Sequence, residues 1–377
     1  MTRRTALLGF GHVAEHGHLP AWRERSDFTI VAVADPDPVR RDVARRLVPG
    51  ARVYDDPEQA LAAERLDVVS IATPPARHAP LALSAARRGL HILCEKPLAT
   101  ALPAYRAMAG AARAAGVALC TVHNWKHSDQ FTQMKALLAE GAIGRPTHLR
   151  LETIRSGRAP SVGHEWRADA ALAGGGILID HGWHTLYLLL GLAEQTPQRL
   201  RATIERRRYT DASVEDTVTC EIEFPSLRGE IFLTWAGDRR HTRWHARGTD
   251  GALTLADDHG DLQRGGMRRE LPFARSLSAG SHHPDWFGAV LDDFAAEIDD
   301  PARRGMNLSE AERCVLLTAL AYESSAQGGR TLAIPAELKD DSPSPPDLEG
   351  GAPSPPGWGG EAPPATPHQR LPMSGAR

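Results

Sequence analysis

The chain has 377 residues, of which 42% are hydrophobic and 24% are charged, so it can bury the cores of two domains of ordinary size. Its formal net charge of −3 argues against a nucleic-acid partner, and no apolar run reaches the ~20 residues of a membrane span. Four scattered cysteines indicate reduced thiols, and we therefore expect a cytoplasmic protein.

A short apolar strand at residues 5–8 leads into the glycine-rich turn Gly9-Phe10-Gly11-His12-Val13-Ala14. This GxGxxA pattern is typical of dinucleotide-binding turns, in which glycines allow the tight turn and the approach of a pyrophosphate. A second strand, at residues 28–34, ends at Asp35, about 20 residues after Ala14, where a ribose-binding carboxylate is expected. The first 35 residues therefore predict a dinucleotide site.

The residues after Asp35 bear on the choice of cofactor. Pro36 and Asp37 follow it directly, and no arginine stands beside it, which favours NAD. Arg40 and Arg41, on the next expected helix, are the alternative, since they would reach the 2′-phosphate of NADP.

The next strands end in two further loops. After a strand near residues 51–54, one at residues 67–72 opens into Ala72-Thr73-Pro74-Pro75, and His78 begins the next helix. A strand at residues 91–94 then runs into Glu95-Lys96-Pro97, where proline stops the strand. Because ligands bind at the carboxyl ends of strands in open α/β sheets, Lys96 is a candidate for chemistry.

A helix at residues 102–115 and a strand at residues 117–122 complete the first half, which ends in His123-Asn124-Trp125-Lys126-His127. Later, Gly174-Gly175-Gly176 opens a helical apolar pattern over residues 176–190. Asp180 and His184 are four residues apart, hence on one face of that helix. A plain intrahelical pair is one alternative. A metal site including His181 is another, which we disfavour because His181 lies off that face.

Strand patterns recur at residues 146–154, 199–209, 214–224, 229–235, 241–248 and 252–256, and their short turns predict an antiparallel meander. A helix is expected at residues 284–298, and a capping box at 309–312 predicts a helix to about residue 327. A final strand is expected at residues 331–334. Residues 336–377 are rich in proline and glycine, and we predict that they are disordered.

These motifs resemble, in order and over roughly residues 4–335, the glucose–fructose oxidoreductase / inositol dehydrogenase / MocA family of NAD(P)-dependent oxidoreductases. The run Gly-Gly-Gly-x-x-x-Asp-x-Gly-x-His of that family matches residues 174–184 at every fixed position. In the family, the lysine at the position of Lys96 touches both the substrate hydroxyl and the nicotinamide ribose. The resemblance implies no metal.

The predicted architecture has three parts. Residues 1–123 form an α/β Rossmann domain with a doubly wound parallel sheet, joined by a returning helix near residues 307–327. Residues 124–335 form an α+β domain with a large, open, mainly antiparallel sheet, through which a homodimer or homotetramer is expected. Residues 336–377 form the tail.

The predicted site residues fall into three groups. Cofactor contacts are Gly9, Phe10, Gly11, His12, Val13, Asp35, Ala72, Thr73, Pro74, His78, Glu95 and Lys96. Catalytic residues are Lys96, Asp180 and His184, and substrate contacts add Asn124, Lys126, Trp166 and Arg167. We expect His184 to be the general base and Asp180 to orient it. The opposite assignment, with lysine as base and histidine as binder, stays open.

The predicted reaction is hydride transfer between NAD and a carbinol or carbonyl carbon of a sugar, sugar derivative or cyclitol. One departure bears on the substrate: many sugar and polyol members carry an aspartate three residues after the histidine, where this chain has Tyr187. Inositol is therefore disfavoured, and an anionic or aromatic-stacking substrate is favoured. The alternatives are an NAD(P)H-dependent carbonyl reductase, a protein with a trapped cofactor, and a non-catalytic cofactor-binding regulator.

Overall fold

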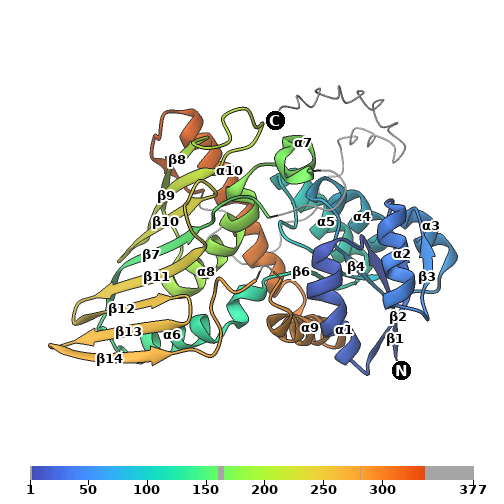
Figure 1. The fold of residues 1–377 in the computed structure, drawn as a ribbon, viewed down its shortest axis with the longest axis horizontal. Helices are drawn as coiled ribbons and strands as arrows, with labels where there is room; N and C mark the ends of the chain where they lie inside the picture. Colours follow the sequence, from blue (N-terminus) through green and yellow to red (C-terminus); the bar gives the residue numbers. More distant parts are fainter. Residues whose placement is uncertain (1, 160–164, 281, 336–377) are drawn as a thin grey trace, which may run out of the picture. The chain divides into compact units, whose positions relative to one another are not determined.

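The computed structural model describes residues 2–159, 165–280 and 282–335 of the chain. These residues form two β-sheets with helices packed against them (Figure 1). All of them belong to one compact unit, Met1–Pro346. The tail predicted at residues 336–377 lies outside the described residues, so its disorder stays a prediction.

The first sheet has six parallel strands, which confirms the predicted fold class of this half. In spatial order they are β3 (Arg52–Tyr54), β2 (Phe28–Ala34), β1 (Arg3–Leu8), β4 (Val68–Ile71), β5 (His91–Cys94) and β6 (Leu119–Thr121). The order reverses between β1 and β4, and in doubly wound sheets ligands bind at that point, outside the carboxyl ends of the strands.

Helices connect these strands and cover the sheet. They are η1 (Ala14–His18), α1 (Leu19–Glu24), α2 (Pro38–Leu47), α3 (Pro57–Ala63), η2 (Pro75–Arg77), α4 (His78–Arg87) and α5 (Leu102–Ala115). Every residue of β4 is buried, as expected for a central strand with helices on both faces.

The second sheet has nine strands. In spatial order they are β14 (Met267–Pro272), β13 (His259–Arg264), β12 (Gly251–Ala256), β11 (His241–Gly248), β7 (Pro146–Ile154), β10 (Arg228–Thr234), β9 (Thr217–Glu223), β8 (Arg199–Glu205) and β15 (Leu332–Ala333). The mainly antiparallel sheet is confirmed. The simple meander is wrong at one place, because β7 is inserted between β10 and β11 and pairs with β10 in parallel.

The sequence pattern does not predict β13 and β14. In β14 only Leu271 is buried, and in β13 only Gly260, so neither strand shows the alternation of apolar and polar residues. These two residues are paired with each other across the strands. Main-chain pairing at the edge of the sheet therefore defines these strands more than side-chain burial does.

The remaining helices surround the second sheet and the junction with the first. They are η3 (Asn124–His127), α6 (Asp129–Ala139), η4 (Trp166–Ala168), α7 (Ala170–Ala173), η5 (Leu178–Gly182), α8 (Trp183–Ala193), α9 (Pro284–Asp299), η6 (Pro301–Arg303) and α10 (Met306–Ala326). Helices α6, α8 and α10 pack against one face of the nine-stranded sheet (Figure 1). The helical pattern predicted over residues 176–190 is confirmed, although its first turn, η5, is a π-helix.

The long helix α10 begins three residues before the capping box predicted at Ser309. The Ser309 N–H already donates to Gly305 O within the first turn. Tertiary contacts set the start instead: Glu297 of α9 accepts hydrogen bonds from Gly305 N (3.1 Å) and Asn307 N (3.2 Å). Asn307 also pairs with the backbone of Thr121 in β6. A carboxylate from another helix therefore caps α10.

Candidate active site

The glycine-rich turn follows β1 at the point where the strand order reverses. Gly9 has a φ of 90°, and a Cβ atom there would lie 2.6 Å from Ala72 O, so only glycine fits. At Gly11 no described atom lies within 4 Å of the position of a Cβ, which leaves this backbone open to a ligand. The turn thus has the shape that a bound diphosphate requires.

Asp35 is joined to this turn, as the spacing in the sequence predicts. Its Oδ2 accepts a hydrogen bond from Phe10 N (2.7 Å) and its Oδ1 accepts one from Asp37 N (2.9 Å). The residue is buried, and burial raises the pKa of its carboxyl above the usual value. Each oxygen keeps a lone pair, so the carboxylate can also accept a hydrogen bond from a ribose hydroxyl.

The two arginines after Asp35 are engaged by protein oxygens. Arg40 is buried and donates from Nε to Phe10 O (2.6 Å) and from Nη2 to Glu15 Oε2 (2.5 Å). Arg41 donates to Asp35 O (3.0 Å). The sequence leaves them as alternatives for binding a 2′-phosphate, and in the structure they brace the turn itself.

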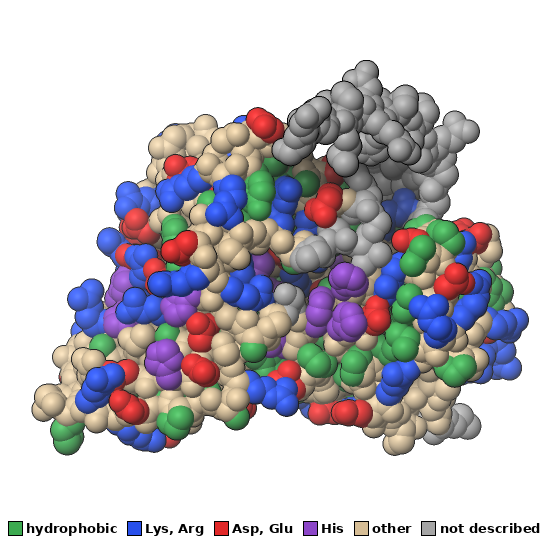
Figure 2. Space-filling view, viewed as in Figure 1, with side chains coloured by type: hydrophobic (Ala, Val, Ile, Leu, Met, Phe, Trp, Pro, Cys, Tyr) green, Lys and Arg blue, Asp and Glu red, His purple; other side chains and the backbone are tan. Residues whose placement is uncertain are grey.

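His12 lies in the turn near two other histidines. Its ring centroid is 5.8 Å from that of His16 and 6.4 Å from that of His282. Burial and the charge of Arg40 lower the pKa of His12, and burial and the neighbouring histidines lower that of His282 to about 4. Figure 2 shows a group of histidine side chains at the surface beside the place of α1 in Figure 1.

His78 is placed differently from the other predicted cofactor contacts. It is 1% exposed, and its ring nitrogens lie 2.8 Å from Pro97 O and 2.9 Å from Thr73 O. It therefore ties the loop after β4 to the turn after β5, and its ring is not open to a ligand. In the neighbouring loop, Thr73 Oγ1 is buried and has no partner within the described residues.

Glu95 is fixed by a buried network that the sequence does not predict. Its Oε1 lies 2.9 Å from His18 Nε2, and the other nitrogen of that ring lies 2.9 Å from Ser70 Oγ. Glu95 Oε2 accepts a hydrogen bond from Lys96 N (3.0 Å). These partners lie far apart in the chain, so no local pattern indicates them. The network fixes the backbone of the turn that carries Lys96.

Lys96, in the turn after β5, meets Asp180, in the π-helical turn η5. Lys96 Nζ donates to the Asp180 carboxylate (2.8 Å) and to Asp180 O (2.7 Å). Burial acts to raise the pKa of Asp180, but Lys96, His181 and Arg167 together outweigh it and hold that pKa well below its usual value. His181 Nδ1 lies 3.3 Å from the other carboxylate oxygen. The ion pair joins the end of β5 to the π-helical turn η5.

His184 lies in the first turn of α8, but its hydrogen-bond partner is not the predicted one. Its Nδ1 is 2.9 Å from the Tyr187 hydroxyl, and no hydrogen bond joins it to Asp180 in the described part of the chain. The expectation that Asp180 orients this ring is therefore wrong, because Lys96 and His181 occupy its carboxylate. Trp125 stacks on the ring, with centroids 5.3 Å apart and planes 27° apart.

Two residues beside Trp125 are also predicted substrate contacts. Asn124 is 7% exposed, and its Oδ1 has no partner within the described residues. Lys126 lies elsewhere: its Nζ is 3.5 Å from Glu310 Oε2, and both residues line a separate cavity of about 200 Å³. Lys96, Asp180 and His184 do not line that cavity. The prediction for Lys126 is therefore not supported, because Glu310 holds its side chain there.

Arg167, in η4, stacks on its neighbour Trp166, with the guanidinium carbon 4.2 Å from the ring centroid. The charge of Arg167 helps to lower the pKa of Asp180, after the larger effects of Lys96 and His181. Its charge also contributes to lowering the pKa of His12 in the glycine-rich turn. Arg167 thus lies within electrostatic reach of both predicted sites.

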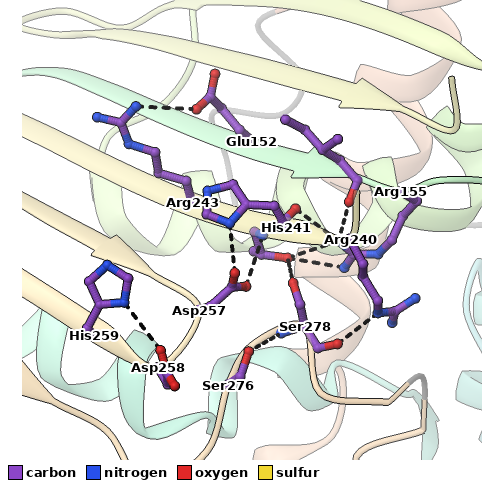
Figure 3. A network of polar contacts seen from close by, with 12 residues as sticks. Glu152, Arg155, Arg240, His241, Arg243, Asp257, Asp258, His259, Ser276 and Ser278 are labelled. Atoms are coloured by element: carbon purple, nitrogen blue, oxygen red, sulfur yellow. Dashed lines mark hydrogen bonds and ion pairs between the residues drawn. The ribbon is translucent and has the colours of Figure 1, made fainter. Parts of the chain in front are cut away.

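A buried arginine next to this site is not predicted from the sequence. Arg155, directly after β7, is 2% exposed and donates to Ile154 O (2.8 Å), His241 O (3.0 Å) and Thr242 Oγ1 (3.1 Å), as Figure 3 shows. No carboxylate forms an ion pair with it within the described residues, and its Nε has no partner there. Burial and then the charge of Arg240 lower its pKa to about 9.

Arg155 and Arg240 act together on the residues around Asp180. Arg240 donates from Nε to Ser278 O (2.8 Å; Figure 3). Burial and then both arginines lower the pKa of His283 to about 4, and burial and then Arg155 lower that of His181 to about 4.

The described residues contain no group of three or more His, Cys, Asp or Glu side chains suited to a metal ion.

A parallel sheet with a dinucleotide turn, in which the lysine after β5 forms an ion pair with the aspartate of η5, is the arrangement expected of an NAD-binding oxidoreductase. Two family profiles agree with this. One, described as an oxidoreductase family with an NAD-binding Rossmann fold, matches residues 3–123, and the other, the GFO/IDH/MocA C-terminal domain, matches residues 131–254. The chain belongs to the GFO/IDH/MocA family of oxidoreductases, as its motifs predict.

Several relatives are similar to this chain. A 1,5-anhydro-D-fructose reductase from Ensifer adhaerens is 32% identical over 189 residues, which span 50% of this chain and about half (56%) of that protein. A putative UDP-kanosamine synthase oxidoreductase subunit from Amycolatopsis mediterranei (strain S699) is 26% identical and covers 89% of this chain and 99% of that protein. GenD2 from gentamicin A biosynthesis, solved in complex with NAD, has a TM-score of 0.75 and 26% identity, covering 89% of this chain and 97% of that chain.

No helix among the described residues is long and apolar enough to cross a membrane.

Proposed function

We propose that the protein transfers hydride between NAD and a carbinol or carbonyl carbon of a sugar, a sugar derivative or a cyclitol. The contact of Lys96 with Asp180 carries this proposal, because it sets a cation beside a carboxylate at the carboxyl end of β5. His184 follows one helical turn later. A cation at that place stabilises negative charge that develops on the reacting oxygen. The names of the relatives support a sugar-like substrate.

The residues of the turn after β1 fit a dinucleotide. Gly9 allows the turn to pass close to the backbone of Ala72, and Gly11 leaves space for a ligand beside the turn. The Asp35 carboxylate, fixed by Phe10 N, can accept a hydrogen bond from a ribose hydroxyl. NAD, when bound, supplies the nicotinamide ring that accepts or gives the hydride. Lys96 holds the substrate oxygen, Asp180 holds Lys96, and the buried network at Glu95 keeps the backbone of Lys96 in place.

NAD is expected to be preferred over NADP by at least about tenfold in kcat/KM, or ~1.4 kcal/mol. The Asp35 carboxylate accepts a hydrogen bond from a ribose hydroxyl but repels a 2′-phosphate, while Arg40 and Arg41 are already bound to protein oxygens. Steady-state kinetics with both cofactors measure the ratio, which Asp35→Ser should narrow. Asp37→Ser, at the neighbouring helix cap, is the control. Equal use of both cofactors by the native protein would contradict this prediction.

We infer further that the substrate carries an anionic group. Lys96, Arg155, Arg167 and Arg240 all act electrostatically on Asp180 or on groups beside it, and the Asp257 carboxylate is bound to His241 (2.7 Å). Positive charge therefore exceeds negative charge around Asp180. The chemistry fits a carboxylate, as in a uronate, or a phosphate ester, as in a sugar phosphate or nucleotide sugar.

The test is a panel of matched substrates, scored by the appearance of NADH at mildly alkaline pH. Each neutral sugar is paired with its uronate and its phosphate ester. We expect the anionic member to have about tenfold higher kcat/KM or more, and the advantage to shrink with added salt. Arg240→Gln should reduce that advantage, whereas the matched Arg243→Gln, beside Glu152 on the exposed part of β11, should not. Turnover of neutral members alone would refute the charge preference, and turnover of no member would refute the proposed reaction.

The same site can run in the direction of carbonyl reduction, so reduction of a non-sugar carbonyl compound with NADH is the second candidate. A non-catalytic regulator is disfavoured because Lys96, Asp180 and His184 come together in one place. Absorbance of nicotinamide in the purified protein would identify a trapped cofactor.

We further propose that the two sheets belong to two domains that meet near residue 123, where the first family profile ends. A homodimer or homotetramer through the second sheet is supported by its alternation, since every second residue of β8, together with Thr219, Glu221 and Glu223 of β9, is exposed or partly exposed. The four cysteines are free and buried, which supports a reducing compartment such as the cytoplasm.

A further inference from the structure

The hydroxyl of Tyr187 lies at the centre of the contacts that hold His184. The residue is 1% exposed, so water does not reach its hydroxyl freely. Its oxygen accepts a hydrogen bond from Trp125 N (3.0 Å) and lies 2.9 Å from His184 Nδ1. The described part of the chain offers this hydroxyl no third partner. Which of the two groups donates in the contact between Tyr187 and His184 therefore follows from the protons that each group carries.

A backbone N–H is only a donor, and a phenol has a single proton to give. Because Trp125 already donates to the oxygen, the Tyr187 proton has one acceptor within the described residues, His184 Nδ1. If Nδ1 carried a proton instead, the phenol proton would be buried without an acceptor. The cost of an unmatched buried donor disfavours that arrangement by about 10- to 100-fold in population.

The charge state of the ring is set by its surroundings. Burial, and then the charges of Lys96 and His181, hold the pKa of His184 well below its usual value, while Asp180 opposes them and His123 adds to them. The ring is therefore neutral near pH 7 and carries one proton. With Nδ1 serving as acceptor, that proton is on Nε2, for which no partner is found within the described residues.

We propose that Tyr187 is a positioning residue that fixes His184 as a hydrogen-bond donor, with Nε2–H directed to the substrate oxygen, and that Lys96 carries the substrate proton. This rests on the hydride transfer proposed above. A neutral ring that already holds a proton on Nε2 cannot take another there without becoming a cation, which its surroundings disfavour. Lys96, at the same place, is the remaining proton carrier.

The step balances with Lys96 as the only proton carrier. In carbonyl reduction, bound NADH would supply the hydride to the carbonyl carbon, the C=O π bond would become a C–O single bond, and the Lys96 ammonium gives its proton to the oxygen. In oxidation, the uncharged Lys96 amine takes the hydroxyl proton, and bound NAD would accept the hydride from the carbon. His184 donates a hydrogen bond to the oxygen in both directions and changes no charge.

The test is nitrogen NMR of the full-length protein with labelled histidine, with and without NAD, with His184→Gln used to assign the ring. We expect the wild type to show a protonated Nε2 and a bare Nδ1. Tyr187→Phe should shift the ring to a mixture of both tautomers and lower turnover about tenfold or more. In the oxidation direction it should also add a second ionisation, below that of Lys96, to the acidic limb of the pH–rate profile, because a bare Nε2 then becomes available as a base.

Tyr105→Phe is the matched control, since it also loses a buried hydroxyl that makes one hydrogen bond, here to Leu308 O (2.9 Å). It should leave the tautomer and the pH–rate profile unchanged. A wild-type ring protonated on Nδ1 would overturn the proposal, as would a Tyr187→Phe spectrum identical to that of the wild type. The tautomer needs no substrate, so it decides this proposal even if the proposed reaction fails. If Tyr187→Phe does not fold, the wild-type spectrum alone decides it.

Discussion

Replacement of Lys96 by methionine is expected to lower turnover by about 10²–10³-fold, the usual loss when one strong donor to a developing oxyanion is removed. Methionine keeps most of the length of the side chain and removes the charge that the structure places on Asp180. Affinity for NAD should change much less, because the turn after β1 and Asp35 are untouched. Turnover at saturating cofactor and fluorescence titration with NADH measure the two quantities separately.

Lys126→Met is the matched control for this variant. Lys126 is also a lysine at the edge of the first sheet, but it faces Glu310 in a separate cavity, so its loss should leave turnover within a few-fold of the wild type. In Lys96→Met the buried Asp180 carboxylate loses its cation, which can destabilise the fold. Thermal unfolding of both variants therefore shows whether each is still folded. Near-native turnover in folded Lys96→Met would refute the role of Lys96.

Replacement of His184 by alanine is expected to lower turnover by about 10²–10³-fold in either direction of the reaction. The loss is that of one hydrogen bond from Nε2 to the reacting oxygen, together with the packing of the ring on Trp125. Because the proton is carried by Lys96, the pH–rate profile should keep its shape while the whole curve falls. The profile is measured as kcat and as kcat/KM over the range in which the protein is folded.

Replacement of His184 by glutamine tests whether a hydrogen-bond donor alone can fill the role of the ring. Its amide can place an N–H near the position of Nε2, but it cannot act as a base near neutral pH. His184→Gln should therefore recover much of the turnover that His184→Ala loses. His184→Asn, whose amide is one carbon shorter, should not. If glutamine is as inactive as alanine and the pH–rate profile changes with both, His184 is the base after all.

The sequence predicts much of the fold because the relevant signals are local. The turn at Gly9 and the strand that ends at Asp35 follow each other at fixed spacing, and the structure joins them directly. The helix predicted at residues 102–115 is found with the same bounds, since a periodic segment ended by a glycine needs no distant partner. Lys96 and Asp180 lie on the elements predicted for them, and the structure adds that they touch.

What the sequence could not indicate is the partner of each side chain. Helical spacing suggests that Asp180 serves His184, but the wider π-helical turn and the approach of Lys96 turn the carboxylate elsewhere. Lys126 follows the same strand end as its neighbours, yet Glu310, from a helix far along the chain, decides its direction. Arg155 shows no pattern at all, because its burial results from strands that pair with β7 much later in the chain.

The buried Arg155 also limits how the thermal stability of the protein can be increased. A charge without a carboxylate partner is costly to bury, and an apolar side chain of similar volume would avoid that cost. Engineering for heat tolerance alone would therefore favour losing the charge at this position. The same change would remove positive charge from the surroundings of Asp180 and weaken any preference for anionic substrates. Thermal stability and preference for anionic substrates therefore place opposite demands on position 155. A variant stabilised by an apolar residue there would discriminate less between anionic and neutral substrates.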